Sequence, residues 1–236
     1  MRVFAEAFRA VEQNKVILGL YIVLSAGVHG FFIAAMTVLA KVAGTPFPRW
    51  AIATYLITGI VACAAFASLQ AVVLARLGRI LDRPLWKVKT DREALQRFFM
   101  PWFLFQLAIF MSVELHKRLV ASGTADLLMA ALLLMAASVP VCACIMFHGR
   151  FVWRELGVAL APLLHRLPEA LLVLLAGLVE AVLVLYMVEN QYYGRGVWVI
   201  ADIVEAYFHC LLFAATWFIC MAHRRDQEEE ESGFDF

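Results

Sequence analysis

Acidic and imidazole side chains recur at helical spacing toward the C-terminal end of the chain. Asp202, Glu205 and His209 lie three and four residues apart, and on a helix of about 3.6 residues per turn this spacing places all three on one face. Carboxylates and imidazoles gathered on one face can hydrogen-bond to neighbouring helices, exchange protons or bind a cation. The spacing of Glu205 and His209 is also one with which two residues of a helix reach the same metal ion.

Other polar residues interrupt apolar stretches elsewhere in the sequence. Glu180 follows the small residues Ala176 and Gly177, which would let a neighbouring backbone approach closely. Consecutive helices usually pack together, so Glu180 is expected to meet Glu205 or His209. The full set of candidate intramembrane residues is His29, Gln106, Glu180, Asp202, Glu205 and His209.

Three interpretations of this polar set remain open. The groups join helices by hydrogen bonds without a further role, or they relay protons or bind a substrate cation, or they bind a metal ion through Glu205 and His209. A metal site is disfavoured because no matching His/Glu pair appears on a second helix. Haem is disfavoured as well, since His29 and His209 are the only two histidines expected at similar depth. The sequence predicts no cofactor.

The elements that carry these residues must be membrane-spanning helices. Hydrophobic residues make up 64% of the 236 residues and charged residues 17%, against about 25% charged residues in soluble domains. A span needs about 20 apolar residues. Six segments without Lys or Arg qualify, at residues 16–40, 50–75, 98–115, 126–147, 169–188 and 197–221. The sequence therefore predicts an all-α polytopic membrane protein, and a rise of about 1.5 Å per residue places every candidate except Asp202 near one depth.

Basic residues are divided unevenly between the two sides of these spans. If both termini are cytoplasmic, the cytoplasmic segments hold about three Lys or Arg for each one outside, and basic residues favour the cytoplasmic side. Amphipathic stretches around residues 4–12, 91–98 and 151–167 each precede a pair of spans, and such stretches lie in the membrane interface. We predict three hairpins, each preceded by a cytoplasmic amphipathic segment, in a bacterial inner membrane. Residues 1–222 form this six-helix transmembrane domain, with an interfacial helix at 1–15.

This layout carries a resemblance to a known group of proteins. The stretches that carry it are FRAVEQNK at residues 8–15, ARLGR at 75–79 and REAL at 92–95. With them the chain resembles bacterial six-helix inner-membrane proteins, and it is similar to the membrane domain that precedes some glycerophosphodiester phosphodiesterases. The 236 residues contain no phosphodiesterase domain, so the resemblance implies an architecture and no catalytic residue.

Two charged segments are candidates for binding a partner. The basic cytoplasmic loop at residues 76–97 would anchor on anionic lipid or dock an acidic partner. Residues 223–236 form an acidic C-terminal tail whose composition predicts disorder in the free chain, and whose final aromatic residues could anchor it on a basic pocket. The candidate partner-binding residues are Arg76, Arg79, Arg83, Phe234, Asp235 and Phe236.

The sequence lacks the common motifs of soluble catalysis, with no GxGxxG, Walker A, HExxH or GxSxG. A net charge of +1 gives no case for binding nucleic acid. The sequence favours a non-enzymatic subunit or scaffold of a larger membrane assembly, with the lipid bilayer, other membrane subunits or a second copy as partners. Two alternatives remain: a small transporter or channel with a midplane carboxylate/histidine site for a proton or cation, and a lipid-active membrane enzyme that the resemblance alone suggests.

Overall fold

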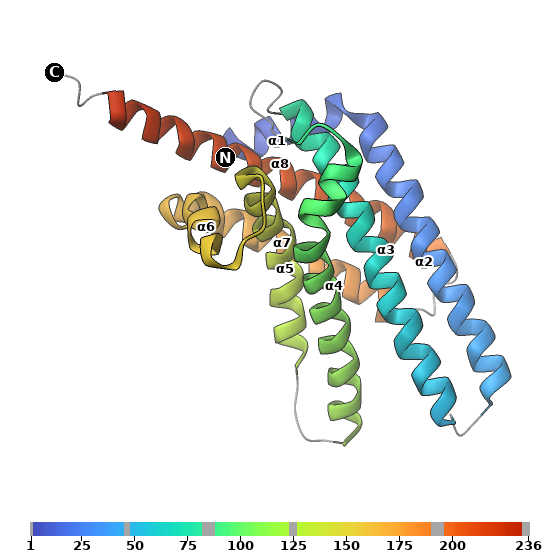
Figure 1. Cartoon of the computed structure of the whole chain (residues 1–236). Coiled ribbons are helices and arrows are strands. Elements are labelled where there is room, and N and C mark those ends of the chain that lie inside the picture. Colours follow the sequence, from blue (N-terminus) through green and yellow to red (C-terminus); the bar gives the residue numbers. More distant parts are fainter. Residues whose placement is uncertain (1, 45–47, 82–87, 123–126, 190–195, 233–236) are drawn as a thin grey trace.

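A computed structural model describes residues 2–44, 48–81, 88–122, 127–189 and 196–232. All regular secondary structure within these residues is helical, and no strand occurs among them (Figure 1). The helices are α1 (Arg2–Gln13), α2 (Lys15–Ala43), α3 (Arg49–Leu81), α4 (Asp91–Ser122), α5 (Leu128–His148), the 3₁₀ turn η1 (Trp153–Glu155), α6 (Leu156–His165), α7 (Leu167–Glu189) and α8 (Gly196–Ser232).

Six of these helices are long and apolar enough to cross a membrane, namely α2, α3, α4, α5, α7 and α8. An all-α protein with six candidate spans is therefore confirmed. The helices run past the apolar segments from which they are predicted. With 33 residues, α3 is about 50 Å long, whereas the hydrocarbon core is about 30 Å thick. Helix ends therefore continue into the polar flanks.

The three stretches predicted to be amphipathic take different forms. The first forms α1, which packs against α8 and buries Ala7, Ala10 and Val11. The second is not a separate segment, because residues 91–98 are the first turns of α4. Its helix start is capped by Thr90, whose Oγ1 accepts a hydrogen bond from the Glu93 amide at 3.2 Å. The third forms η1 and the short helix α6.

The connection from α5 to α6 is set by a glycine and an acidic side chain. Gly149 ends α5 with φ +90°, a left-handed conformation that other residues rarely adopt. The Glu155 carboxylate then lies 3.1 Å from His148 Nε2 and accepts a hydrogen bond from Arg150 at 2.7 Å. The hydrogen bond with His148 contributes most to lowering the pKa of the Glu155 carboxyl below its usual value, and the contacts with Arg150 lower it further. The turn between the two helices is thereby fixed.

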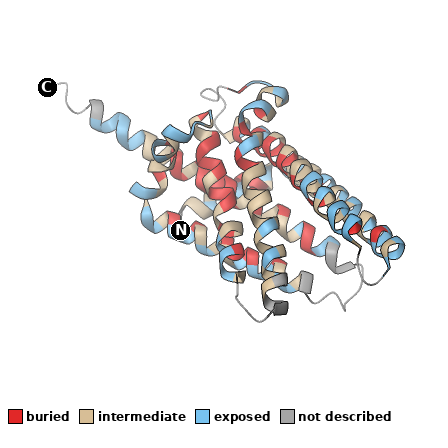
Figure 2. Ribbon diagram, turned by 60° about the horizontal axis from the view of Figure 1, so that its bottom comes forward, coloured by how far each residue is buried: buried red, intermediate tan, exposed pale blue. Residues whose placement is uncertain are grey.

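The interior is formed chiefly by α3, α5 and α8, and the buried residues gather there (Figure 2). Trp217 of α8 is completely buried, between Phe213 of its own helix, Phe147 of α5 and Gly78 of α3. Helices α5 and α7 also approach closely. A Cβ atom on Gly177 would lie only 2.8 Å from a backbone oxygen of α5, so glycine is needed where the backbones meet.

The acidic C-terminal segment differs from its expected form. Residues 223–232 are not disordered but continue α8, which ends at Ser232, and this end projects from the rest of the molecule (Figure 1). Glutamate is a good helix former, and Arg166 forms an ion pair with Asp226 that ties the extension to the start of α7. The remaining tail residues, 233–236, lie outside the described part of the chain.

Candidate functional site

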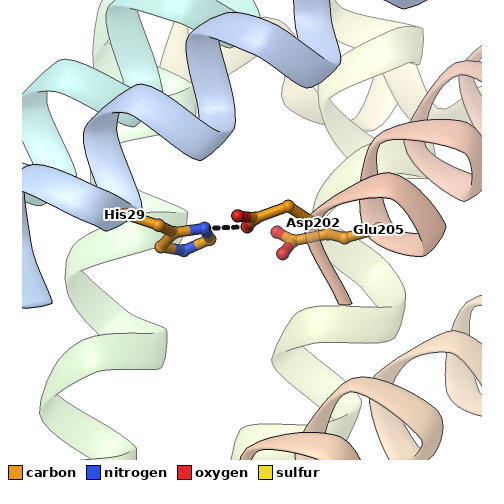
Figure 3. A group of neighbouring side chains, drawn as sticks. All are labelled: His29, Asp202 and Glu205. Atoms are coloured by element: carbon orange, nitrogen blue, oxygen red, sulfur yellow. Dashed lines mark hydrogen bonds and ion pairs between the residues drawn. The ribbon is translucent and has the colours of Figure 1, made fainter. Parts of the chain in front are cut away.

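One histidine from α2 faces two carboxylates from α8. Figure 3 shows the His29 imidazole opposite the side chains of Asp202 and Glu205. His29 Nδ1 is hydrogen-bonded to Asp202 Oδ1. The ring also packs against Phe66 of α3, with 4.3 Å between the ring centroids. One potential ligand atom of each of the three residues lies within 4.8 Å of the other two. Three donor atoms from two helices therefore lie close together.

The second histidine links three helices. The Tyr21 hydroxyl of α2 lies 2.7 Å from His209 Nδ1. On the other side of the ring, His209 Nε2 lies 3.2 Å from Glu180 of α7 and 3.9 Å from Glu205 of its own helix. Both ring nitrogens of His209 are hydrogen-bonded when the Tyr21 hydroxyl donates to Nδ1 and the N–H at Nε2 donates to Glu180. His209 thus holds α2, α7 and α8 together, and the structure brings Glu180 to it as the sequence predicts.

A cavity of about 270 Å³ opens beside both groups. We call it the polar cavity, which is lined by apolar residues of α4, α5 and α7 and by six polar residues, His29, Gln106, Ser138, Glu180, Glu205 and His209. A water molecule occupies about 30 Å³ in the liquid, so the polar cavity has room for several waters or a hydrated ion. Five of the six candidates of the sequence therefore border one space, and Asp202 joins them through His29.

Asp202 is the candidate whose position differs most from the prediction. Counted along the last span from its outer end, Asp202 is expected nearer the outer surface than the other candidates. In the structure it contacts His29, which lies near the middle of α2. The reason is that α8 crosses α2 obliquely (Figure 1), so distance along a helix does not measure depth. Its side chain is only 7% exposed.

Two residues of the network are missing from the sequence-based candidates. Tyr21 binds His209, as described, and Gln70 of α3 accepts a hydrogen bond from Gln106 Nε2 at 3.0 Å. Gln70 is fully buried. Gln70 could have been found as a polar residue inside a predicted span. Nothing in the sequence distinguishes the hydroxyl of Tyr21 from that of a tyrosine at the membrane surface.

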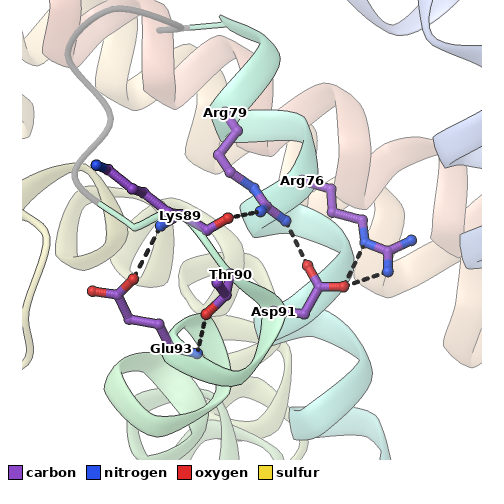
Figure 4. Close-up of polar contacts among 6 residues, drawn as sticks. All are labelled: Arg76, Arg79, Lys89, Thr90, Asp91 and Glu93. Atoms are coloured by element: carbon purple, nitrogen blue, oxygen red, sulfur yellow. Dashed lines mark hydrogen bonds and ion pairs between the residues drawn. The ribbon is translucent and has the colours of Figure 1, made fainter.

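Two of the candidate partner-binding residues lie in the described part of the chain, apart from this site. Arg76 and Arg79, at the end of α3, both bind the Asp91 carboxylate at the start of α4 (Figure 4). Arg79 also donates a hydrogen bond to the Lys89 carbonyl at 2.6 Å. These two guanidinium groups therefore join α3 to α4. The other candidates, Arg83, Phe234, Asp235 and Phe236, lie outside the described residues.

No known protein family, curated protein or solved structure matches this chain. The resemblance to six-helix inner-membrane proteins therefore stays a prediction, and the function has to be argued from the site itself.

Within the described parts of the chain, no Lys or Arg forms an ion pair with the carboxylates of the site. Glu180, Asp202 and Glu205 supply three carboxylates, with the imidazoles of His29 and His209 beside them. The six predicted apolar spans contain no Lys or Arg. A buried carboxylate is costly unless a hydrogen bond, a proton or a cation compensates it. The arrangement is therefore suited to bind and release positive charge.

Proposed function

We propose that the protein is a small transporter or channel that moves a cation across the membrane, with the polar cavity and the adjoining Asp202 as its binding site. The observation that carries the proposal is the convergence of three carboxylates and two imidazoles from α2, α7 and α8 around a cavity among spanning helices. Ionisable groups inside membrane domains commonly mark ion pathways. A purely structural role would need no cavity beside them.

The proposal includes the topology predicted from the sequence. Three hairpins correspond to the order of the six candidate spans. The distribution of basic residues favours a cytoplasmic location for both termini, in a bacterial inner membrane. In this orientation the polar cavity lies between the two membrane surfaces, since His29 and Glu180 are near the middle of α2 and α7. A site at this depth is accessible from either side after small helix movements.

Cation flux into proteoliposomes tests this function. We expect flux of at least one cation from a panel of H⁺, Na⁺, K⁺ and Mn²⁺, and a loss of about 10-fold or more in Glu180→Gln and in Glu205→Gln, because each removes a charge that faces the cation. Glu169→Gln on α7 and Glu228→Gln on α8 are matched controls, since both carboxylates lie at helix ends away from the polar cavity. Unchanged flux in both site variants, or no flux in the wild type, would contradict the proposal.

The exposed end of α8 favours a second function, that of a subunit in a larger membrane assembly. Residues 226–230 are all exposed and four of them are acidic, so this helix end offers a charged surface to a basic partner. Deletion of residues 228–236 is expected to abolish co-purification of a partner subunit in mild detergent while the protein remains inserted. Failure of the full-length protein to retain any partner would argue against this role.

A further inference from the structure

We propose that His29, Asp202 and Glu205 bind a divalent transition-metal ion, such as Mn²⁺, Fe²⁺ or Zn²⁺, between α2 and α8. This inference rests on the proposed function, because it names the class of cation that the site takes. Its first support is geometric: each residue offers one ligand atom, and these atoms all lie within 4.8 Å of one another. Bonds of about 2.0–2.2 Å to one ion would bring ligand atoms to about 3–4.4 Å. Only small side-chain movements would therefore bring the three ligand atoms from their present positions to the distances of a metal-bound site.

The donor types select the metal class. Carboxylate oxygens suit Mg²⁺, Ca²⁺ and Mn²⁺, whereas imidazole nitrogen suits Zn²⁺, Fe²⁺ and later transition metals. One imidazole with two carboxylates therefore favours a divalent transition metal over an alkali cation. The charges agree with this choice, because the carboxylates of Asp202 and Glu205 together neutralise a doubly charged ion. A neutral complex avoids much of the cost of holding charge inside the membrane domain.

The surroundings provide the other parts of a metal site. Asp202 is almost fully buried, and Phe66 packs against the His29 ring, so two of the three ligands are held in place. His209 lies 3.9 Å from Glu205, beside the ligand set and outside it. The polar cavity borders His29 and Glu205 and leaves room for water at the remaining coordination positions. Three protein ligands with a position left for water are found in metal sites that bind a further ligand.

The hydrogen bond between His29 and Asp202 shows where the ion would lie. A proton shared between an imidazole nitrogen and a carboxylate oxygen occupies the place that a metal ion takes when both groups coordinate it. Binding of the metal therefore replaces this hydrogen bond and releases any proton held there. Competition between proton and metal at the same atoms is a property that a merely structural hydrogen bond would lack.

Binding of Mn²⁺ to the purified full-length protein in detergent, followed by electron paramagnetic resonance, tests the site without requiring transport. We expect one Mn²⁺ per chain, displaced by Zn²⁺, and an affinity lowered more than about 10-fold in Asp202→Asn, Glu205→Gln and His29→Ala. Asp226→Asn and Glu228→Gln, the same substitutions at exposed positions of α8, should bind as the wild type does. The isosteric Asp202→Asn and Glu205→Gln decide the outcome if His29→Ala fails to fold.

The possible results separate this inference from the proposed function. Wild-type protein that binds no Mn²⁺ or Zn²⁺, or folded Asp202→Asn and Glu205→Gln variants that retain wild-type affinity, would overturn the metal site even if another cation is transported. Binding that depends on the three ligands in a protein without flux would support the metal site and contradict the transport function. Binding and flux lost together in Asp202→Asn, with both retained in Asp226→Asn, would support both.

Discussion

Replacing His209 with leucine is expected to lower the free energy of unfolding by about 2–4 kcal/mol. The imidazole is the polar partner of Tyr21 and of Glu180, and leucine can pair with neither. Both partners are almost fully buried, and each buried polar group left without a partner costs about 1–3 kcal/mol. Unfolding in mixed detergent micelles, monitored by far-ultraviolet circular dichroism, measures the loss. His165→Leu is the control, because that histidine is exposed on α6.

The same network predicts a rescue that distinguishes lost hydrogen bonds from lost packing. Adding Glu180→Leu and Tyr21→Phe to His209→Leu removes the groups that the first change leaves unpaired. Replacing all partners of a buried hydrogen bond with apolar groups is close to neutral, so the triple variant should regain most of the lost stability. A triple variant that is less stable than His209→Leu alone would show that the site is held together by shape and not by polar pairing.

Truncation of Trp217 to alanine is expected to cost about 3–5 kcal/mol, the range for a buried tryptophan in a well-packed core. The indole is 0% exposed and fills the space between three helices. Its ring centroid lies 5.3 Å from that of Phe213 and 5.0 Å from that of Phe147, and its edge lies against Gly78. Alanine would leave a cavity where α3, α5 and α8 meet.

The matched control for this change is Trp153→Ala, since Trp153 of η1 is 69% exposed. In the same unfolding experiment it should change the free energy of unfolding by less than about 0.5 kcal/mol. Equal losses in the two variants would contradict the packing at Trp217. Trp217→Ala should lower stability without lowering metal affinity, because Phe147, Phe213 and Gly78, against which the indole packs, are not among the residues that line the polar cavity.

The six candidate spans could be predicted from composition because a helix that crosses hydrocarbon must be apolar along about 20 residues. Helix ends could not, because polar residues with good helix propensity continue a helix into water. Residues 91–98 and 223–232 show this, and both are parts of longer helices. Hydropathy identifies the apolar residues that can lie in hydrocarbon. A helix ends elsewhere, at a cap or at a left-handed glycine such as Gly149.

Periodicity placed Asp202, Glu205 and His209 on one face of α8, because the spacing of 3.6 residues is a property of a single helix. What that face meets depends on packing between helices far apart in the sequence. Within that face, Asp202 and Glu205 reach His29 of α2, whereas His209 reaches Tyr21 of the same helix. Packing between the helices also decides which donor atoms come together, so Glu205 lies near His29 and Asp202 in the possible ligand set and also 3.9 Å from His209.

The contacts at the polar cavity join the first long helix to the last, across 173 residues from His29 to Asp202 and 188 from Tyr21 to His209. During synthesis α2 is therefore inserted long before its polar partners leave the ribosome. A chain truncated ahead of α8 leaves a histidine of α2 and a glutamate of α7 without the groups that satisfy them, in surroundings where unsatisfied polar groups are costly. These groups are satisfied in the completed protein and unsatisfied in a truncated one, so assembly of the site has to wait for the last helix.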